Sequence, residues 1–188
     1  MKALGIAAIL LFISVLTNAQ ENFVTWNENE PLQWNDFSGK ADHSSSFEAE
    51  SFAEVKYSYQ FNSPRDFHFN VKASFNRNTS WIKQGYKSDA LLKHEQLHFD
   101  IAELYARKLK VAFDNYTYSS NYEEEIVQIF SRVKLIYHKT QQLYDEETNH
   151  SLIATVQKEW EVLVKEELDN VKKIKYSNWQ QPLFVKNK

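Results

Sequence analysis

The sequence predicts an α+β fold, in which an N-terminal antiparallel β-hairpin or small sheet packs on three long C-terminal helices. Two patterns predict this fold. Residues 47–75 largely alternate between apolar and polar side chains, whereas residues 89–171 repeat their apolar side chains at helical spacing. The 188 residues include only three glycines and three prolines, so most of the chain is expected to form regular elements.

The alternation predicts two strands. From Phe47 to Phe61 most odd positions are apolar and most even positions are polar, with Phe52 as the exception, and residues 67–75 repeat the pattern. A period of two over this length is typical of half-buried strands. Residues 62–65 (NSPR) are typical of a turn, so we expect a hairpin with one face exposed to solvent.

Three helices are expected after the hairpin. Ser88 is a suitable N-cap for a helix over residues 89–113, and residues 114–121 form a polar break. A second helix is expected to start near Tyr122, because apolar side chains recur there at 3.6-residue spacing. A third helix is expected over roughly residues 152–171.

The first 19 residues are predicted to be a secretory signal peptide. Lys2 precedes an almost wholly apolar run over residues 3–16, and residues 17–19 (TNA) suit cleavage before Gln20. The alternative is a membrane anchor, but this run is shorter than the roughly 20 residues that cross a bilayer. We therefore expect export to the periplasm or the exterior of a bacterium, without stable membrane insertion after cleavage.

The rest of the chain, residues 20–188, is long enough for one domain with its own core. It divides into a β-rich part (20–82), a helical part (88–171) and a basic tail (172–188). The sequence has no cysteine, which in an exported protein favours a bacterial origin over a disulfide-dependent secretory route. Its net charge of −3 gives no reason to expect binding to nucleic acid.

The first predicted helix contains the sequence His94-Glu95-Gln96-Leu97-His98. At about 100° per residue the two histidines lie roughly 40° apart and one turn apart, so both imidazoles can reach one metal ion. Glu95 is offset by about 100° and can reach a water molecule on that ion. Two zinc ligands and a general base form the H-E-x-x-H motif, which leaves a further ligand to be found. An accidental match on a solvated helix face is the alternative, but the neighbouring leucines predict that this helix packs.

The segment Tyr144–His150 (YDEETNH) is where we expect the third ligand. On the second helix Glu147 continues the apolar stripe and needs a partner, while His150 follows where that helix ends. Both qualify as the third ligand, and helix geometry alone does not choose between them. Tyr144 could donate a hydrogen bond to a developing oxyanion. The simpler interpretation is a helix end with a satisfied core glutamate.

Three stretches of the sequence resemble a known family. These are residues 94–107 (HEQLHFDIAELYAR), residues 32–37 (LQWNDF) and residues 144–150, which together resemble motifs of the DUF922 family. The resemblance implies a zincin-like fold and a secreted bacterial zinc-dependent protease. It also implies His150 rather than Glu147 as the third ligand. The family commonly has a glycine after that histidine, whereas this chain has Ser151.

The motif and the resemblance together predict an exported zinc metallopeptidase that hydrolyses a peptide or protein substrate. His94, His98 and His150 would bind Zn²⁺, and Glu95 would act as general base toward a zinc-activated water. Tyr144 would assist at the oxyanion. Two alternatives are a catalytically silent, metal-containing binding protein on a zincin scaffold and a helical protein in which the motif is accidental.

Overall fold

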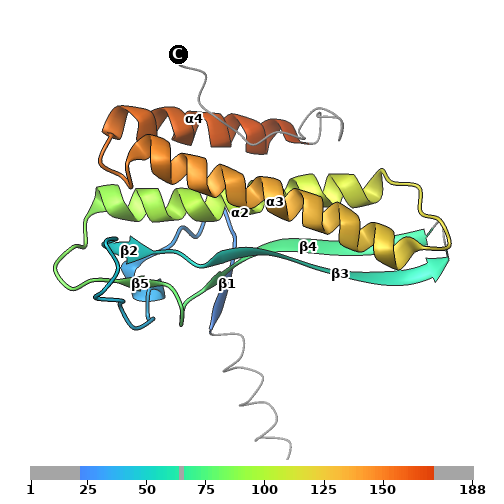
Figure 1. The fold of residues 1–188 in the computed structure, drawn as a ribbon, viewed down its shortest axis with the longest axis horizontal. Helices are drawn as coiled ribbons and strands as arrows, with labels where there is room; N and C mark the ends of the chain where they lie inside the picture. The colour runs from blue at the N-terminus through green and yellow to red at the C-terminus, as the bar shows by residue number, and fades with distance from the viewer. Residues whose placement is uncertain (1–21, 64–65, 172–188) are drawn as a thin grey trace, which may run out of the picture.

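The computed structural model describes residues 22–63 and 66–171, and it has the α+β architecture that the sequence predicts. A small antiparallel sheet lies on one side of the molecule, the first two of three long helices lie next to it, and the third packs on these two helices on the side away from the sheet (Figure 1). The predicted signal peptide (1–19) and basic tail (172–188) lie outside the described residues. Among the described helices, none is both long enough and apolar enough to cross a bilayer.

The main sheet has three strands in the order β1-β4-β3. β3 (Ala53–Ser63) and β4 (Asp66–Asn76) form the predicted antiparallel hairpin, and β1 (Phe23–Thr25) pairs with the other edge of β4. The period-two pattern has the expected result, because Phe69, Ala73 and Phe75 of β4 are buried. One face of the hairpin therefore contributes to the core.

The first predicted strand is shorter than expected at its N-terminal end. Residues 47–52 instead contain the two-residue strand β2 (Ala49–Glu50), which pairs with β5 (Trp81–Ile82) in a separate antiparallel sheet. The interruption includes Phe52, the residue that breaks the alternation. Its N–H donates to the Ser80 hydroxyl (2.9 Å), and its carbonyl accepts from the Asn76 N–H (2.9 Å). These bonds replace the ladder bonds of a continuous strand.

The helices are α2 (Asp89–Asp114), α3 (Tyr122–Thr148) and α4 (Ala154–Asn170), and a short 3-10 helix, η1 (Trp34–Asp36), precedes the hairpin. Ser88 is the N-cap of α2 as predicted, since its side chain accepts from the Leu91 N–H (3.2 Å). The predicted starts and ends of the helices all agree with the structure to within two residues.

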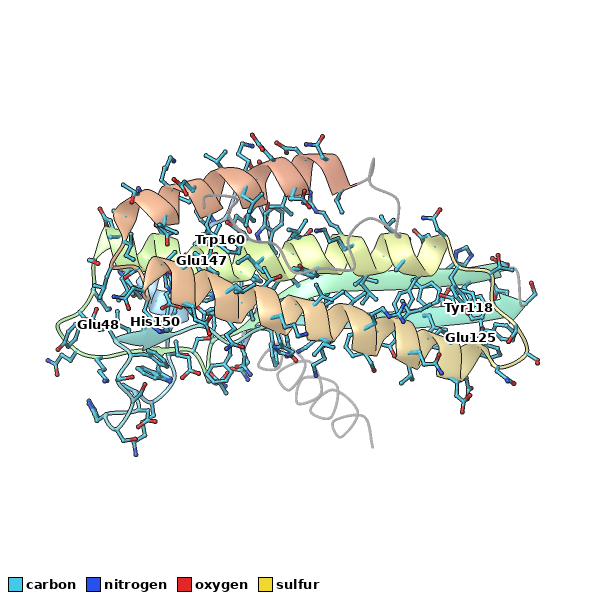
Figure 2. The ribbon with its side chains drawn as sticks, turned by 45° about the horizontal axis from the view of Figure 1, so that its top comes forward. Glu48, Tyr118, Glu125, Glu147, His150 and Trp160 are labelled. Atoms are coloured by element: carbon cyan, nitrogen blue, oxygen red, sulfur yellow. The ribbon has the colours of Figure 1, made fainter. Side chains whose placement is uncertain are left out.

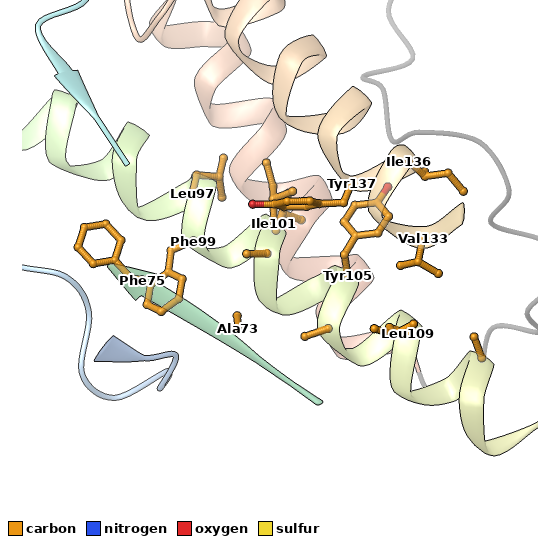
Figure 3. Packing of buried hydrophobic residues seen from close by; sticks show 14 of the residues in the cluster. Ala73, Phe75, Leu97, Phe99, Ile101, Tyr105, Leu109, Val133, Ile136 and Tyr137 are labelled. Carbon is orange, nitrogen blue, oxygen red and sulfur yellow. The ribbon is translucent and has the colours of Figure 1, made fainter. Parts of the chain in front are cut away.

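The core is built around α2, which contacts the sheet, α3 and α4. Ile101, Tyr105 and Leu109 of this helix are fully buried between the sheet and α3 (Figure 3). Each such side chain contributes about 1.5–3 kcal/mol to the free energy of unfolding. The Tyr105 hydroxyl is satisfied by Thr140 Oγ1 of α3 at 2.7 Å. Residues on α2 are therefore held by packing on several sides.

The turn between α3 and α4 has an unusual backbone. Asn149, His150 and Ser151 all have positive φ, of 48°, 51° and 74°. The His150 N–H donates to the Asp145 carbonyl (3.0 Å), which closes the end of α3. A residue other than glycine in the left-handed region costs about 1–2 kcal/mol. A glycine at position 151 would suit this turn, and Ser151 carries the strain instead.

We expect Ser151→Gly to raise the free energy of unfolding by about 0.5–1 kcal/mol, because relief of the left-handed strain exceeds the entropy that glycine adds to the unfolded chain. Urea unfolding of both proteins measures the difference. The matched control is Ser58→Gly on β3, an exposed residue with ordinary φ, which should lower the free energy of unfolding. A loss of stability in Ser151→Gly would contradict the strain.

Candidate metal centre

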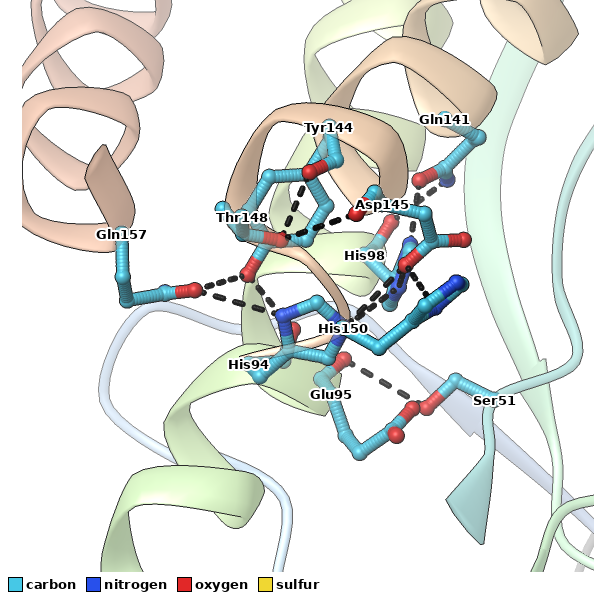
Figure 4. Close-up of polar contacts among 10 residues, drawn as sticks. All are labelled: Ser51, His94, Glu95, His98, Gln141, Tyr144, Asp145, Thr148, His150 and Gln157. Atoms are coloured by element: carbon cyan, nitrogen blue, oxygen red, sulfur yellow. Dashed lines mark hydrogen bonds and ion pairs between the residues drawn. The ribbon is translucent and has the colours of Figure 1, made fainter. Parts of the chain in front are cut away.

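Two histidines of α2 and one aspartate of α3 bring three potential ligand atoms together (Figure 4). His94 Nε2 and His98 Nε2 are 3.2 Å apart, as the spacing of one helical turn predicts. Asp145 Oδ1 lies 3.1 Å from His94 Nε2 and 3.0 Å from His98 Nε2. The three atoms form a nearly equilateral triangle.

This triangle suits a tetrahedral zinc ion. Ligand atoms about 2.0–2.1 Å from a tetrahedrally coordinated zinc are about 3.3 Å from one another. The observed separations of 3.0–3.2 Å are close to that value. Two imidazole nitrogens and a carboxylate oxygen are also a ligand set that catalytic zinc sites use. The spacing and chemistry of His94, His98 and Asp145 therefore fit a zinc ion.

The other nitrogen of each imidazole is held by an amide. His98 Nδ1 lies 2.6 Å from Gln141 Oε1, and His94 Nδ1 lies 3.2 Å from Gln157 Oε1. The Gln141 amide is oriented by its own N–H group, which donates to the His98 carbonyl at 2.9 Å. An amide oxygen only accepts, so each Nδ1 carries the proton and donates it. When each ring is neutral, its lone pair is therefore on Nε2, the atom that faces Asp145 and would bind a metal.

Tyr144 lies against the two imidazoles and is fully buried. Its ring stacks on His94 with 4.6 Å between centroids, and its hydroxyl donates to Gln157 Oε1 at 2.7 Å. Burial raises the pKa of this hydroxyl well above its usual range. The Tyr144 hydroxyl, which was expected to meet an oxyanion, instead lies against Gln157. It orients the Gln157 amide, and this amide holds His94.

Glu147 and His150, the two expected third ligands, lie in different places. Glu147 Oε2 accepts a hydrogen bond from the Trp160 indole N–H of α4 (2.8 Å), and Figure 2 shows the pair between α3 and α4. His150 Nδ1 lies 3.4 Å from Asp145 Oδ1, and its ring contacts Phe47. The structure therefore places His150 beside Asp145 and Glu147 against Trp160, while the group of mutually close ligand atoms is His94, His98 and Asp145.

Asp145 is the site residue that sequence reasoning did not select. The available signal was its place in the segment Tyr144–His150, directly after a tyrosine on the buried stripe. The buried stripe continues to Glu147 and favoured that residue. Asp145 is offset from Tyr144 by about 100° and faces α2 from the edge of the stripe. Gln141 and Gln157 were also missed, because a glutamine on a helix gives no sign that its amide will meet a histidine.

The charges of His98 and Asp145 depend on each other. Burial alone would lower the pKa of His98, but the hydrogen bond and the charge of Asp145 outweigh it and raise that pKa to about 9. Burial alone would raise the pKa of Asp145, yet the two histidines hold it well below its usual range. In the metal-free protein at neutral pH, His98 and Asp145 therefore form a partly buried ion pair.

These groups line an open cavity of about 530 Å³. Glu95 also lines it and is almost completely buried, with a relative exposure of 3%. Its Oε2 has no hydrogen-bond partner in the described part of the chain. A buried carboxylate oxygen without a partner is costly, so this atom needs a water molecule, a proton or a substrate group. Glu95 is thus placed beside the ligands, as the motif predicts.

Fold and site together define an α+β protein whose central helices hold a candidate metal centre next to a buried carboxylate. The family described as "Bacterial protein of unknown function (DUF922)" matches residues 33–151, and the chain belongs to this family. The match confirms the resemblance that the three motifs indicate. No match was found among curated proteins or among solved structures, so the zincin-like fold stays a prediction.

We expect Asp145→Asn to lower zinc affinity by more than about 100-fold, because even the residues that orient metal ligands are typically worth 10- to 100-fold. The matched variant Glu147→Gln should leave zinc affinity unchanged, since Glu147 is bonded to Trp160. Competition with a chromophoric chelator measures both affinities. If Glu147→Gln lost zinc affinity and Asp145→Asn kept it, Glu147 would be the ligand instead.

Zinc binding at about pH 7 should release about one proton, because His98 is protonated in the metal-free protein and must lose its proton to bind. The raised pKa stabilises the metal-free protein below the unfolded value of about 6.5, and this stabilisation is lost as pH rises through about 9. Zinc affinity should therefore increase with pH up to about 9. Calorimetry in buffers of different ionisation enthalpy counts the protons, and a count near zero would contradict the ion pair.

Proposed function

We propose that the protein is an exported, zinc-dependent metallopeptidase that hydrolyses peptide bonds. The observation that carries the proposal is the position of Glu95, whose buried and unpartnered Oε2 shares one cavity with His94, His98 and Asp145. A general base must lie within reach of the metal ligands without being one of them. The predicted signal peptide, residues 1–19, supports the export part of the proposal.

In this mechanism His94, His98 and Asp145 would hold the ion, and His150 lies beside Asp145. A bound zinc ion supplies Lewis acidity, which polarises a carbonyl and lowers the pKa of a water molecule. Glu95 accepts the proton of the attacking water and then donates it to the amine nitrogen as the peptide bond breaks. Gln141 and Gln157 keep both imidazoles in the tautomer that binds metal.

The short strand β2 offers a place for an extended substrate. It lines the cavity, and its pairing with β5 uses the backbone on one side only, as when the Glu48 carbonyl accepts from the Lys83 N–H (2.8 Å). Alternation along the strand leaves the N–H and C=O of Ala49 directed away from β5. A peptide could pair with this edge and pass the candidate metal centre.

We expect Glu95→Gln to lower kcat/KM for peptide hydrolysis by about 10²- to 10⁴-fold while the protein keeps its zinc, because the substitution removes only the base. Hydrolysis of a quenched fluorescent peptide library and metal analysis of the same samples measure the two properties. His98→Ala, as comparison, should lose both.

Two results would contradict this proposal. Full activity in Glu95→Gln would exclude the assigned base. A zinc-loaded wild-type protein that cleaves no member of the library would instead identify the catalytically silent metal-containing binding protein.

A further inference from the structure

The charged lining of the cavity is one-sided. It contains four carboxylates, Glu48, Glu50, Glu95 and Asp145, whereas its only basic side chains are histidines and no lysine or arginine is among the described lining residues. A divalent cation at the metal centre would offset the two charges of Glu95 and Asp145. The charges of Glu48 and Glu50 would remain. The cavity is therefore negative on the side that β2 forms.

Glu48 and Glu50 are placed to meet a substrate. They are two residues apart on the strand segment, so their side chains leave on the same face. Glu48 is exposed, and Figure 2 shows it at the same end of the molecule as His150, with which it lines the cavity. Glu50 is half-buried and lies directly opposite Trp81 of β5 in the strand pair. The Glu50 side chain is thus partly shielded from solvent.

Burial raises the pKa of Glu50, and the charges of Glu95 and Asp145 raise it further. Glu95 Oε2, which is buried and lacks a hydrogen-bond partner in the described chain, shows independently that this space is built to receive a polar ligand.

The rim of the same cavity is apolar. Phe47 and Phe52 flank β2 with relative exposures of 40% and 44%, and Leu152 follows the α3–α4 turn with 72%. Large apolar side chains that are this exposed and line one cavity indicate a binding surface. Carboxylates inside and apolar side chains at the rim match a peptide in which a cationic side chain neighbours apolar ones.

We propose that the site selects basic peptide segments, with a lysine or arginine side chain facing Glu48 and Glu50 and apolar neighbours on Phe47, Phe52 and Leu152. The inference rests on the proposed peptidase function and specifies its substrate class. Backbone pairing with the Ala49 edge would be independent of sequence. The selection would come from the charge of the cavity and from its rim.

The experiment compares three series of quenched fluorescent peptides that differ only in one residue, lysine, glutamine or glutamate, moved stepwise along an apolar host. At one position or two neighbouring positions we expect kcat/KM to be at least fivefold higher for lysine than for glutamine, and lower again for glutamate. The preference should shrink as ionic strength rises. Equal rates for all three residues at every position would overturn the inference.

Single substitutions test whether Glu48 and Glu50 cause the preference for lysine. Glu48→Gln and Glu50→Gln should each reduce the lysine preference severalfold, with unchanged zinc content. The control Glu124→Gln makes the same charge change on an exposed residue at the start of α3, at the opposite end of the molecule from His150, and should leave the preference intact (Figure 2, where its neighbour Glu125 is labelled). A double variant that keeps the full preference would contradict the assignment to β2.

A binding measurement separates this inference from the peptidase proposal. Zinc-loaded Glu95→Gln should bind the lysine peptide more tightly than the glutamate peptide, as fluorescence anisotropy shows without any hydrolysis. If wild type cleaves nothing but this binding preference holds, the peptidase proposal fails and the selection of basic peptides stands. If wild type cleaves all three series equally, the peptidase proposal stands and the charge selection is wrong.

Discussion

The contact on which the site depends is the approach of Asp145 to two imidazoles of the central helix. One carboxylate oxygen lies about 3 Å from His94 Nε2 and His98 Nε2, at the wall of the open cavity. In metal-free protein the charge of protonated His98 stabilises Asp145, and a cation can replace that proton. The pairing also connects α2 to α3, so the position of the ligands and the packing of the helices are set together.

The residues around this contact fix its geometry, but some of their polar atoms have no partner and part of their backbone is strained. Gln157 accepts from both Tyr144 and His94, but its own amide N–H group has no partner among the described residues. Glu95 Oε2 is likewise buried without a partner. The turn that follows Asp145 adds three consecutive residues with positive φ. Unsatisfied groups and backbone strain within one region are typical of a functional site that the packed core stabilises.

Much of the fold could be predicted from the sequence, because a long apolar pattern shows which face of a helix or strand is buried, whatever that face packs against. The hairpin, the Ser88 cap and the three helices follow from local rules. β2 and the break at Phe52 could not be predicted, since they depend on hydrogen bonds to Ser80 and Asn76 far along the chain. The same limit applies to the site. His94, Glu95 and His98 lie on one helix and were found, whereas Asp145 and Gln157 come from other helices, and their meeting depends on how those helices pack.

His150 determines whether the metal centre is closed or open. A zinc ion held by four protein side chains is typical of a structural site, and one held by three leaves a position for water or substrate. His150 is close enough to Asp145 to be a hydrogen-bond or ion-pair partner, but its side chain is 44% exposed and lies on the turn rather than inside α3. Its ring rests on Phe47, at the cavity rim. His94, His98 and Asp145 lie on the packed helices α2 and α3. The remaining coordination position faces the open cavity, which solvent and a substrate can reach. That asymmetry favours a metal centre with one open position over a closed one.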